Sequence, residues 1–413
     1  MKEEINPSIK MGESISSPGP SPGAMDRGAS VDAYRGFVMF LMMAEVLNLS
    51  AVARAHPGNG FWQFLAHHQT HAEWRGCSLH DLIQPGFSFL VGVALSFSIA
   101  KRRARGERPS RMVAHAFWRA LVLILLGVFL RSIGSPQTRW TFEDTLTQIG
   151  LGYGFLFLIG LVLRSRGQWI ALVLLLVGYW LAFVVYPLPG ANFNYAGAGA
   201  DPSAPYWMNG FAAHWNKNTN FAWGFDQWFL NLFPRSKPFA FNDGGYSTLS
   251  FLPTLATMIL GLIAGNQVRG DLSPGSKMKW LVFAGTISLL LGFVLDFLGI
   301  CPSVKRIWTP AWTLFSGGWC FLFLATFYWI MEIRKIRGWS FPFIVIGANS
   351  IAAYFMAHLF EGFVVSSLKT HLGKTVFRFA GESYEPMVRG AATLLVLWLL
   401  LYWMYRRRLF LKI

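Results

Sequence analysis

Five of the nine histidines in the chain lie within one short polar segment: His56, His67, His68, His71 and His80. Imidazole is the side chain that gives and takes protons near neutral pH, and a neighbouring carboxylate orients the ring and stabilises its cationic form. Glu73 follows His71 closely, and Asp81 directly follows His80. Because segment 70–92 then continues into an apolar stretch, these residues indicate proton-transfer chemistry at a membrane boundary.

Two alternatives compete with a catalytic role for the histidines. His67 and His71 are four residues apart and would share a helix face, as the histidines of some metal sites do. Only carboxylates are available as further ligands and there is no HExxH motif, so we predict no metal. Any single histidine could instead bond the loop to lipid headgroups. We predict His71 as the catalytic residue, assisted by Asp81 and Glu73.

The composition is that of a membrane protein. Of the 413 residues, 54% are hydrophobic and 14% are charged, against about 25% charged in soluble domains. The net charge of +16 does not indicate nucleic-acid binding, because the basic residues cluster in short loops between apolar runs.

Ten apolar stretches approach the roughly 20 residues that span a bilayer. They cover approximately 34–53, 82–100, 115–133, 146–163, 169–187, 248–265, 280–299, 311–331, 341–365 and 390–405. The expected fold is an all-α polytopic bundle of about ten transmembrane helices.

The basic loop 101–111, KRRARGERPSR, sets the expected orientation. The positive-inside rule places it in the cytoplasm, together with both termini. Segments 54–81 and 188–246 then lie outside. The second is rich in Trp, Phe, Asn, Gly and Pro, which favours a folded cap over a simple connector. Loop 101–111 could bind coenzyme A or anionic lipid, although fixing the topology explains it most simply.

Two further features concern the ends and the thiols of the chain. Residues 1–30 are rich in Ser, Pro and Gly, which predicts a disordered tail before a transmembrane domain at 31–413. Of the three cysteines, Cys77 and Cys301 both fall in expected outer segments. Free thiols are favoured, and one bridge between these two stays open.

Charged and polar residues within the apolar stretches predict a polar cavity. Glu45 lies in the first stretch and Asp296 deep in the seventh, and each costs about 3 kcal/mol in a bilayer without a polar neighbour. The other polar groups are Asn48, Asn349, Ser350 and His358. We expect Glu45, Asn349 and His358 to face the cavity, and Asn48 and Asp296 to bond between helices.

Three motifs resemble the heparan-α-glucosaminide N-acetyltransferase family of membrane acetyltransferases. Ser30-Val31-Asp32-Ala33-Tyr34-Arg35-Gly36 resembles its S-[LV]-D-x-x-R-G segment. The run from His71 through Trp74 and Asp81 to Pro85 resembles its H-x-x-W-x-G-x-x-x-x-D-L-[VI]-x-P motif. Gly347-Ala348-Asn349-Ser350, with Tyr354 and His358, is similar to its G-x-N-[SA]-x-x-x-Y segment. The likeness covers roughly residues 30–413.

The resemblance implies acetyl transfer across the membrane, from cytoplasmic acetyl-CoA to an amino sugar or surface glycan outside. It makes His71 the catalytic histidine, either as an acetylated nucleophile or as the general base of a ternary complex. It also implies an acyltransferase domain over 31–413, in a bacterial relative located in the inner membrane. Membrane lipid and a second copy of the chain, as a homodimer, complete the expected partners. The predicted substrate- or cofactor-binding residues are Asp32, Arg35, Glu45, Trp74, Asn349, Ser350 and His358.

Departures from the family pattern keep other functions open. Glu45 and Val46 stand where relatives often carry an asparagine, and Gln84-Pro85-Gly86 replaces an aromatic-rich segment. The acceptor and even the acyl donor could therefore differ, and O-acylation of glycans is one such variant. The principal alternative is a proton-coupled transporter or flippase with Glu45, Asp296 and His358 as its relay.

Overall fold

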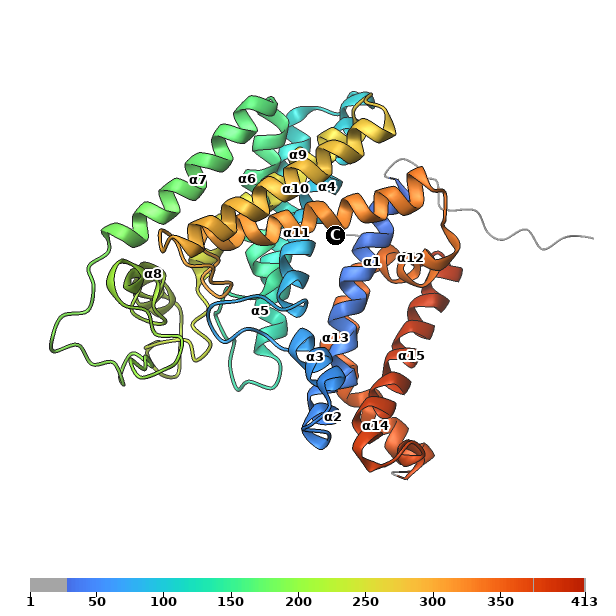
Figure 1. The fold of residues 1–413 in the computed structure, drawn as a ribbon. Coiled ribbons are helices and arrows are strands. Elements are labelled where there is room, and N and C mark those ends of the chain that lie inside the picture. Colours follow the sequence, from blue (N-terminus) through green and yellow to red (C-terminus); the bar gives the residue numbers. More distant parts are fainter. Residues whose placement is uncertain (1–27, 374, 412–413) are drawn as a thin grey trace, which may run out of the picture.

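The computed structural model describes residues 28–373 and 375–411, so most of the predicted N-terminal tail lies outside the described residues. Over the described residues the chain is an all-α membrane bundle, as predicted (Figure 1). Its helices are α1 (Ala29–Met43), α2 (Leu49–Ala55), α3 (Gly60–Gln69), α4 (Ile83–Ala104), α5 (Pro109–Ser132), α6 (Thr145–Val162), α7 (Ser165–Val185), α8 (Phe221–Phe229), α9 (Phe251–Arg269), α10 (Pro274–Phe297), α11 (Pro310–Tyr328), α12 (Phe341–Ala348), α13 (Ser350–Leu359), α14 (Glu361–Leu372) and α15 (Glu385–Arg406). Short turns η1 (Ala44–Leu47), η2 (His80–Leu82) and η5 (Thr248–Ser250) adjoin α1, α4 and α9.

The described residues contain eight helices long and apolar enough to cross a membrane, and two bent helix pairs. Counting each pair as one span gives the ten expected spans. The pair of α1 and α2 bends by 43°, and the pair of α12 and α13 by 72°. The sequence pattern did not reveal these two breaks.

An asparagine marks each break. Asn48 has φ of +48°, a left-handed conformation that asparagine tolerates better than most residues. Asn349 is fully buried and satisfies backbone groups of the C-terminal segment: its amide donates to the carbonyl of Leu409 (2.8 Å) and accepts from the N–H of Leu411 (3.1 Å). The break at Asn349 is therefore fixed by hydrogen bonds to the end of the chain.

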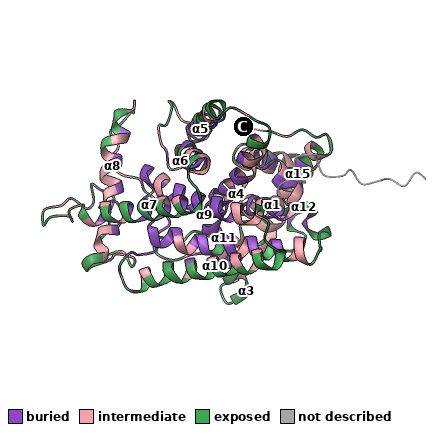
Figure 2. Ribbon diagram, turned by 90° about the horizontal axis from the view of Figure 1, so that it is seen from above, coloured by how far each residue is buried: buried purple, intermediate pink, exposed green. Residues whose placement is uncertain are grey.

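Helices α4 and α9 form the centre of the bundle (Figure 2). In the most apolar stretch of the span that contains α9, 89% of the residues are buried inside the protein. The corresponding share is 22% for α10 and 22% for the span that contains α15. The peripheral helices expose leucine, phenylalanine and valine side chains along their outer faces. In a bilayer such faces contact lipid, where apolar side chains have no unfavourable contact with water.

Glycines let the two central helices touch backbone to backbone. A Cβ atom added at Gly92 of α4 would overlap the carbonyl oxygen of Met258, and one added at Gly261 of α9 would overlap that of Phe89. Small residues at such a crossing permit the close packing that holds membrane helices together. The backbones of α4 and α9 are therefore in contact at Gly92 and Gly261.

Segment 186–247, between α7 and η5, packs as a cap beside α7, with α8 as its longest helix (Figure 1). Trp215 is fully buried in it, against Phe183 of α7 and Trp74. The Asn216 side chain bonds both backbone groups of Met208, at 2.9 and 2.8 Å. Buried aromatic rings and satisfied amides thus hold the cap to one end of the bundle, here termed the cap end.

Replacing Gly92 with alanine should destabilise the bundle, because its Cβ must push α4 and α9 apart. Overpacking of this kind costs about 1–3 kcal/mol. The control is Gly178→Ala in α7, where an added Cβ meets nothing within 4 Å. Thermal unfolding in detergent should show a lower Tm for Gly92→Ala and an equal or slightly higher Tm for Gly178→Ala. A wild-type Tm for Gly92→Ala would contradict the tight crossing.

Candidate active site

Asp81 is the fully buried carboxylate at the centre of the site. Its Oδ2 accepts from the backbone N–H groups of Ala72 (3.1 Å) and Ser78 (3.0 Å) and from the Ser78 hydroxyl (3.1 Å). The Ser78 hydroxyl oxygen in turn accepts from the N–H of Asp81 at 3.3 Å. This reciprocal pair, Ser-x-x-Asp, is a capping box that starts the helical segment leading into α4.

The other oxygen of Asp81 holds an imidazole and an ammonium group. Oδ1 lies 2.8 Å from Nδ1 of His71 and 3.0 Å from Nζ of Lys305. Nζ also lies 2.9 Å from Nδ1, so the three polar atoms form a triangle. Burial lowers the pKa of Lys305, and the charge of Asp81 opposes that shift.

One arrangement of protons satisfies this triangle. Both Nδ1–H of His71 and the Lys305 ammonium donate to Oδ1 of Asp81, rather than to each other. This assignment leaves the lone pair on Nε2, the ring nitrogen without a protein partner in the described structure. An oriented imidazole with a free Nε2 can act as a base or as a nucleophile.

Lys305 reaches the site from the connection 298–309 between α10 and α11. An isolated antiparallel bridge joins Val304 to Arg75 and so fixes this connection against the histidine loop. The next residue, Arg306, donates to the carbonyl of Gly244 in the cap at 2.7 Å. The histidine loop, the connection and the cap therefore lock one another in place.

His71 lies in the wall of a cavity of about 190 Å³, with Lys305 beside it. The cavity is lined by Met42, Glu45, His71, His80, Ile83, Gln84, Phe87, Arg131, Glu143, Asp144, Thr145, Tyr246, Lys305, Tyr354 and His358. His80 is buried, with its ring centroid 4.5 Å from that of His71 and its Nε2 3.7 Å from Glu45. His80 thus links the imidazole of His71 to a carboxylate.

A second polar cluster forms the opposite wall. The Tyr354 hydroxyl donates to Asp144 Oδ2 at 3.0 Å, and Arg131 lies 3.5 Å from the same oxygen. The ring of His358 stacks on Tyr354 at 4.3 Å. Burial raises the pKa of the neighbouring Glu143, and the charge of Arg131 acts against this.

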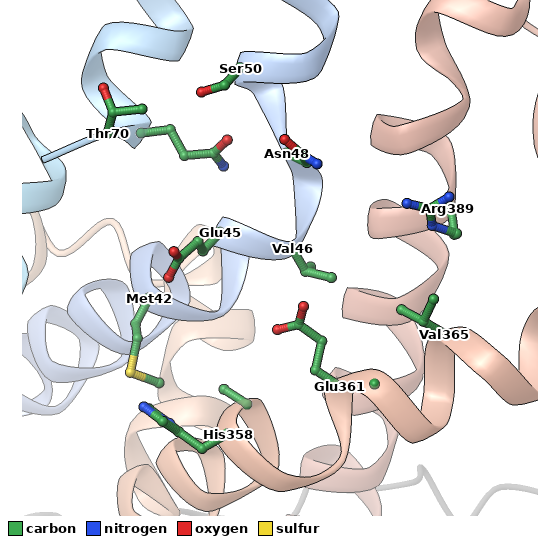
Figure 3. A pocket seen from close by; sticks show the side chains of 13 residues that line it. Met42, Glu45, Val46, Asn48, Ser50, Thr70, His358, Glu361, Val365 and Arg389 are labelled. Carbon is green, nitrogen blue, oxygen red and sulfur yellow. The ribbon is translucent and has the colours of Figure 1, made fainter. Parts of the chain in front are cut away.

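Two larger cavities adjoin this one. The first, of about 640 Å³, shares Met42, Glu45 and His358 with it and adds Glu361, from the first turn of α14, and Arg389 (Figure 3). The second, of about 990 Å³, shares Arg131 and Glu143 and lies between the 134–141 connection and the cap. Acidic groups therefore border the His71 cavity on one side and mostly basic groups border it on the other.

The structure places Glu73 and Trp74 away from the cavity. Glu73 is exposed, and no hydrogen bond or ion pair joins it to His71 within the described residues. Asp81 and Lys305, rather than Glu73, contact the imidazole. Trp74 is buried beneath the cap, where its indole N–H donates to the carbonyl of Trp215 at 3.1 Å. A catalytic role for Glu73 and a binding role for Trp74 stay predictions.

The first motif and the start of the third pack against each other along α1 and α12, whereas Tyr354 and His358 of the third motif line the His71 cavity. Asp32 and Arg35 form an ion pair with each other in the first turns of α1. A Cβ at Gly347 would overlap the carbonyl oxygen of Asp32, so the two motifs pack backbone to backbone. None of these residues lines the His71 cavity, and neither does Asn349 or Ser350. Their predicted binding roles remain untested.

Four expectations about polar residues need correction or completion. Glu45 does line the cavity as expected, but it lies in η1, beyond the end of α1, with its side chain 67% exposed. Asn349 was expected there too, yet it bonds to the C-terminal backbone instead. Asp296 is not deep in a span, because it lies in the last turn of α10, paired with Arg75 at 2.9 Å. The predicted relay of Glu45, Asp296 and His358 is therefore not assembled.

The metal alternative and the thiols are also clarified. Helix α3 ends at Gln69, so His67 and His71 do not share a helix face. Within residues 28–373 and 375–411, no group of three or more His, Cys, Asp or Glu side chains could hold a metal ion.

All three cysteines are free, as favoured. Burial raises the pKa of Cys77 and of Cys301 to about 12, which keeps both thiols protonated.

Sequence reasoning missed several residues of the site. Lys305 contacts a residue 234 positions away, and no local pattern marks it. Asp144, Tyr354 and Arg131 come from three different helices or their ends. The one local signal that was available is the capping box, Ser78-Leu79-His80-Asp81, which predicts a bonded rather than a free carboxylate.

Comparison with known proteins shows which proteins the chain is similar to. No family model matches the chain. It is 23% identical over 428 aligned positions to heparan-alpha-glucosaminide N-acetyltransferase of Homo sapiens, covering 93% of this chain and 59% of the human protein. The Mus musculus protein of the same name is also 23% identical, with 60% of it covered. The chain spans about three fifths of the length of these relatives. The chain is thus related, at the level of the family, to the heparan-alpha-glucosaminide N-acetyltransferases.

Proposed function

We propose that the protein is a membrane acetyltransferase that uses acetyl-CoA and transfers the acetyl group to the amine of an amino sugar or glycan. The observation that carries this proposal is the His71–Asp81–Lys305 cluster, which orients one imidazole nitrogen and leaves the other free at a cavity. The relatives bear the name of an N-acetyltransferase, which supports the same reaction class.

Two routes use this cluster. In the first, Nε2 of His71 attacks the thioester carbon, the C–S bond breaks, and the coenzyme leaves as a thiolate that takes up a proton. The acceptor amine then attacks the acetyl-imidazole carbon, loses a proton and releases the imidazole. In the second, Nε2 removes a proton from the acceptor ammonium, and the amine attacks the thioester carbon directly. The C–S bond breaks, and the coenzyme leaves as a thiolate that takes up the proton lost by the new amide nitrogen. In both, His71 becomes cationic, and Asp81 stabilises that charge.

The proposed sidedness is cytoplasmic for acetyl-CoA and extracytoplasmic for the acceptor. It rests on the basic loop 101–111 and on the opposite position of the cap end along α4 and α5. His71, the cap and the 640 Å³ cavity would then all face the acceptor. The lipid environment would be that of an inner membrane.

The acceptor amine fits the 640 Å³ cavity. Glu45 and Glu361 both line this cavity, from η1 and from α14 (Figure 3). Burial raises the pKa of Glu361, and the charge of Glu45 raises it further, so a cation between the two carboxylates relieves their repulsion. Since Glu45 also lines the His71 cavity, an ammonium group held here lies beside the imidazole.

Replacing His71 with alanine should abolish transfer of radiolabelled acetyl from acetyl-CoA to glucosamine by the purified protein in detergent. A positioned acid–base group contributes about 10²- to 10⁴-fold, and a loss of that size is expected. His67→Ala is the control, since His67 is exposed on α3 and outside the cavity. A normal rate with His71→Ala would overturn the proposal. Activity in detergent also excludes a transporter, which needs a sealed vesicle.

Lys305 should act by positioning His71 and by holding a positive charge beside it. Because burial lowers the pKa of Lys305, its charge is lost at a lower pH than for an exposed lysine, and the rate should fall there. Lys305→Arg should move the alkaline limb of the pH–rate profile to higher pH, since guanidinium stays charged. Lys305→Met should lower kcat at every pH and remove the limb. A Lys305→Met profile of unchanged shape would count against this role.

Glu361→Gln should raise KM for glucosamine and leave KM for acetyl-CoA unchanged. The expected rise is roughly tenfold, because one of two carboxylates facing the ammonium loses its charge. Glu382→Gln is the matched control: its side chain is 83% exposed and lies outside the cavity. Equal KM values for both variants would place the amine elsewhere while leaving the role of His71 intact.

A further inference from the structure

A separate cavity of about 680 Å³ lies at the end of the bundle opposite the cap. It is formed where α4 and α9 end and where α6 connects to α7. Three arginines line it: Arg103 from the last turn of α4, Arg269 from the last turn of α9, and Arg164 from the connection between α6 and α7. No carboxylate lines it in the described part of the chain, so the charged side chains that line it are all cationic.

The floor of this cavity offers neutral donors as well. The Asn266 amide donates to Gln168 at 3.1 Å, and the Gln168 amide donates to the carbonyl of Leu163 at 3.0 Å. Helix α7 begins here, and its N-cap residue Arg164 provides no side-chain cap. The first N–H groups of this 21-residue helix therefore have no side-chain cap, and Ser165 and Gln168 of its first turn line the same cavity as the three arginines. Arginines combined with such N–H groups favour a phosphate.

The cavity is separate from the His71 site. Gln84 and Phe87 of α4 line the His71 cavity, whereas Ser96 and Arg103 line this one. At 100° per residue these pairs lie on roughly opposite faces of α4, and Gln84 and Ser96 are about 18 Å apart along its axis. The backbone contact between α4 and α9 closes the direct route. A ligand bound here does not present a thioester to His71 through that interface.

The rim of the cavity is apolar, which favours a phosphate attached to an acyl chain over a free phosphate. Val162 is 71% exposed and Leu163 is 37% exposed, next to Arg164. An acyl chain can lie along these side chains while its headgroup meets the arginines. A free phosphate would leave this apolar surface uncovered, whereas an amphiphile covers it.

We propose that this cavity binds the phosphate headgroup of an anionic phospholipid, with Arg103, Arg164 and Arg269 as its cationic ligands. Basic pockets between membrane helices are suited to such headgroups. The site would fasten the ends of α4, α7 and α9 to the leaflet at that end of the bundle. This inference is independent of the proposed acetyl transfer.

Native mass spectrometry and thermal unfolding in detergent test the proposal. The probes are phosphatidylglycerol, phosphatidylcholine and coenzyme A at equal concentrations. The test variant is Arg164→Gln/Arg269→Gln, and the control is Arg105→Gln/Arg108→Gln, which removes two exposed arginines of loop 101–111 outside the cavity. The wild-type and control proteins should bind phosphatidylglycerol and gain Tm, and the test variant should bind it at least tenfold more weakly.

Several outcomes would overturn the lipid site. Equal binding of phosphatidylglycerol by all three proteins would show non-specific attraction, and equal binding of phosphatidylcholine would show no role for net negative charge. Displacement of phosphatidylglycerol by coenzyme A, with a raised KM for acetyl-CoA in the test variant, would assign the phosphate to the coenzyme. Lipid binding that persists in His71→Ala would separate this site from catalysis and support the proposal.

Discussion

The buried negative charge of Asp81 is the constraint on which the site depends. An isolated carboxylate in the interior is costly, so its oxygens must be fully engaged by donors. Here Ala72 and Ser78 satisfy one oxygen, while His71 and Lys305 satisfy the other. Three of these donors lie in the histidine loop, and the fourth, Lys305, lies in the α10–α11 connection. Solvating this one charge therefore forces the histidine loop and the α10–α11 connection into a fixed arrangement.

Contacts with the cap also fix the histidine loop and the α10–α11 connection. Trp74 is three residues from His71 and is buried against Trp215, so the histidine loop cannot move without uncovering a large aromatic surface. Arg306, next to Lys305, bonds the cap backbone at Gly244. A loop that carries reactive groups is usually mobile. This loop is held at Trp74, at Arg75 by its bridge to Val304, and at Asp81, which gives the imidazole a defined orientation.

The sequence predicted features that depend on neighbouring residues, and it did not predict contacts between residues far apart in the chain. Apolar stretches located the eight continuous candidate spans and the two bent helix pairs, because burial in lipid demands long apolar runs. The motif around His71 indicated both His71 and Asp81, which are ten residues apart and bonded to each other. Lys305 gave no signal, because a lysine in a polar loop is usually exposed and only the tertiary fold shows that this one is buried. Glu73 was favoured as an orienting group for its proximity in sequence, yet its side chain is exposed.

Charge is distributed unevenly between the two ends of the bundle. Carboxylates Glu45 and Glu361 lie at the cap end, and the arginines around the 680 Å³ cavity lie at the other end. The tight α4–α9 crossing separates the faces of α4 that serve these two regions. A polar path through the centre of the bundle would need polar side chains between α4 and α9. The backbone contact at this crossing leaves no room for them. The polar groups around His71 instead come mainly from the histidine loop, η1, the ends of α5 and α6, the α10–α11 connection and α13, all at the cap end of the bundle.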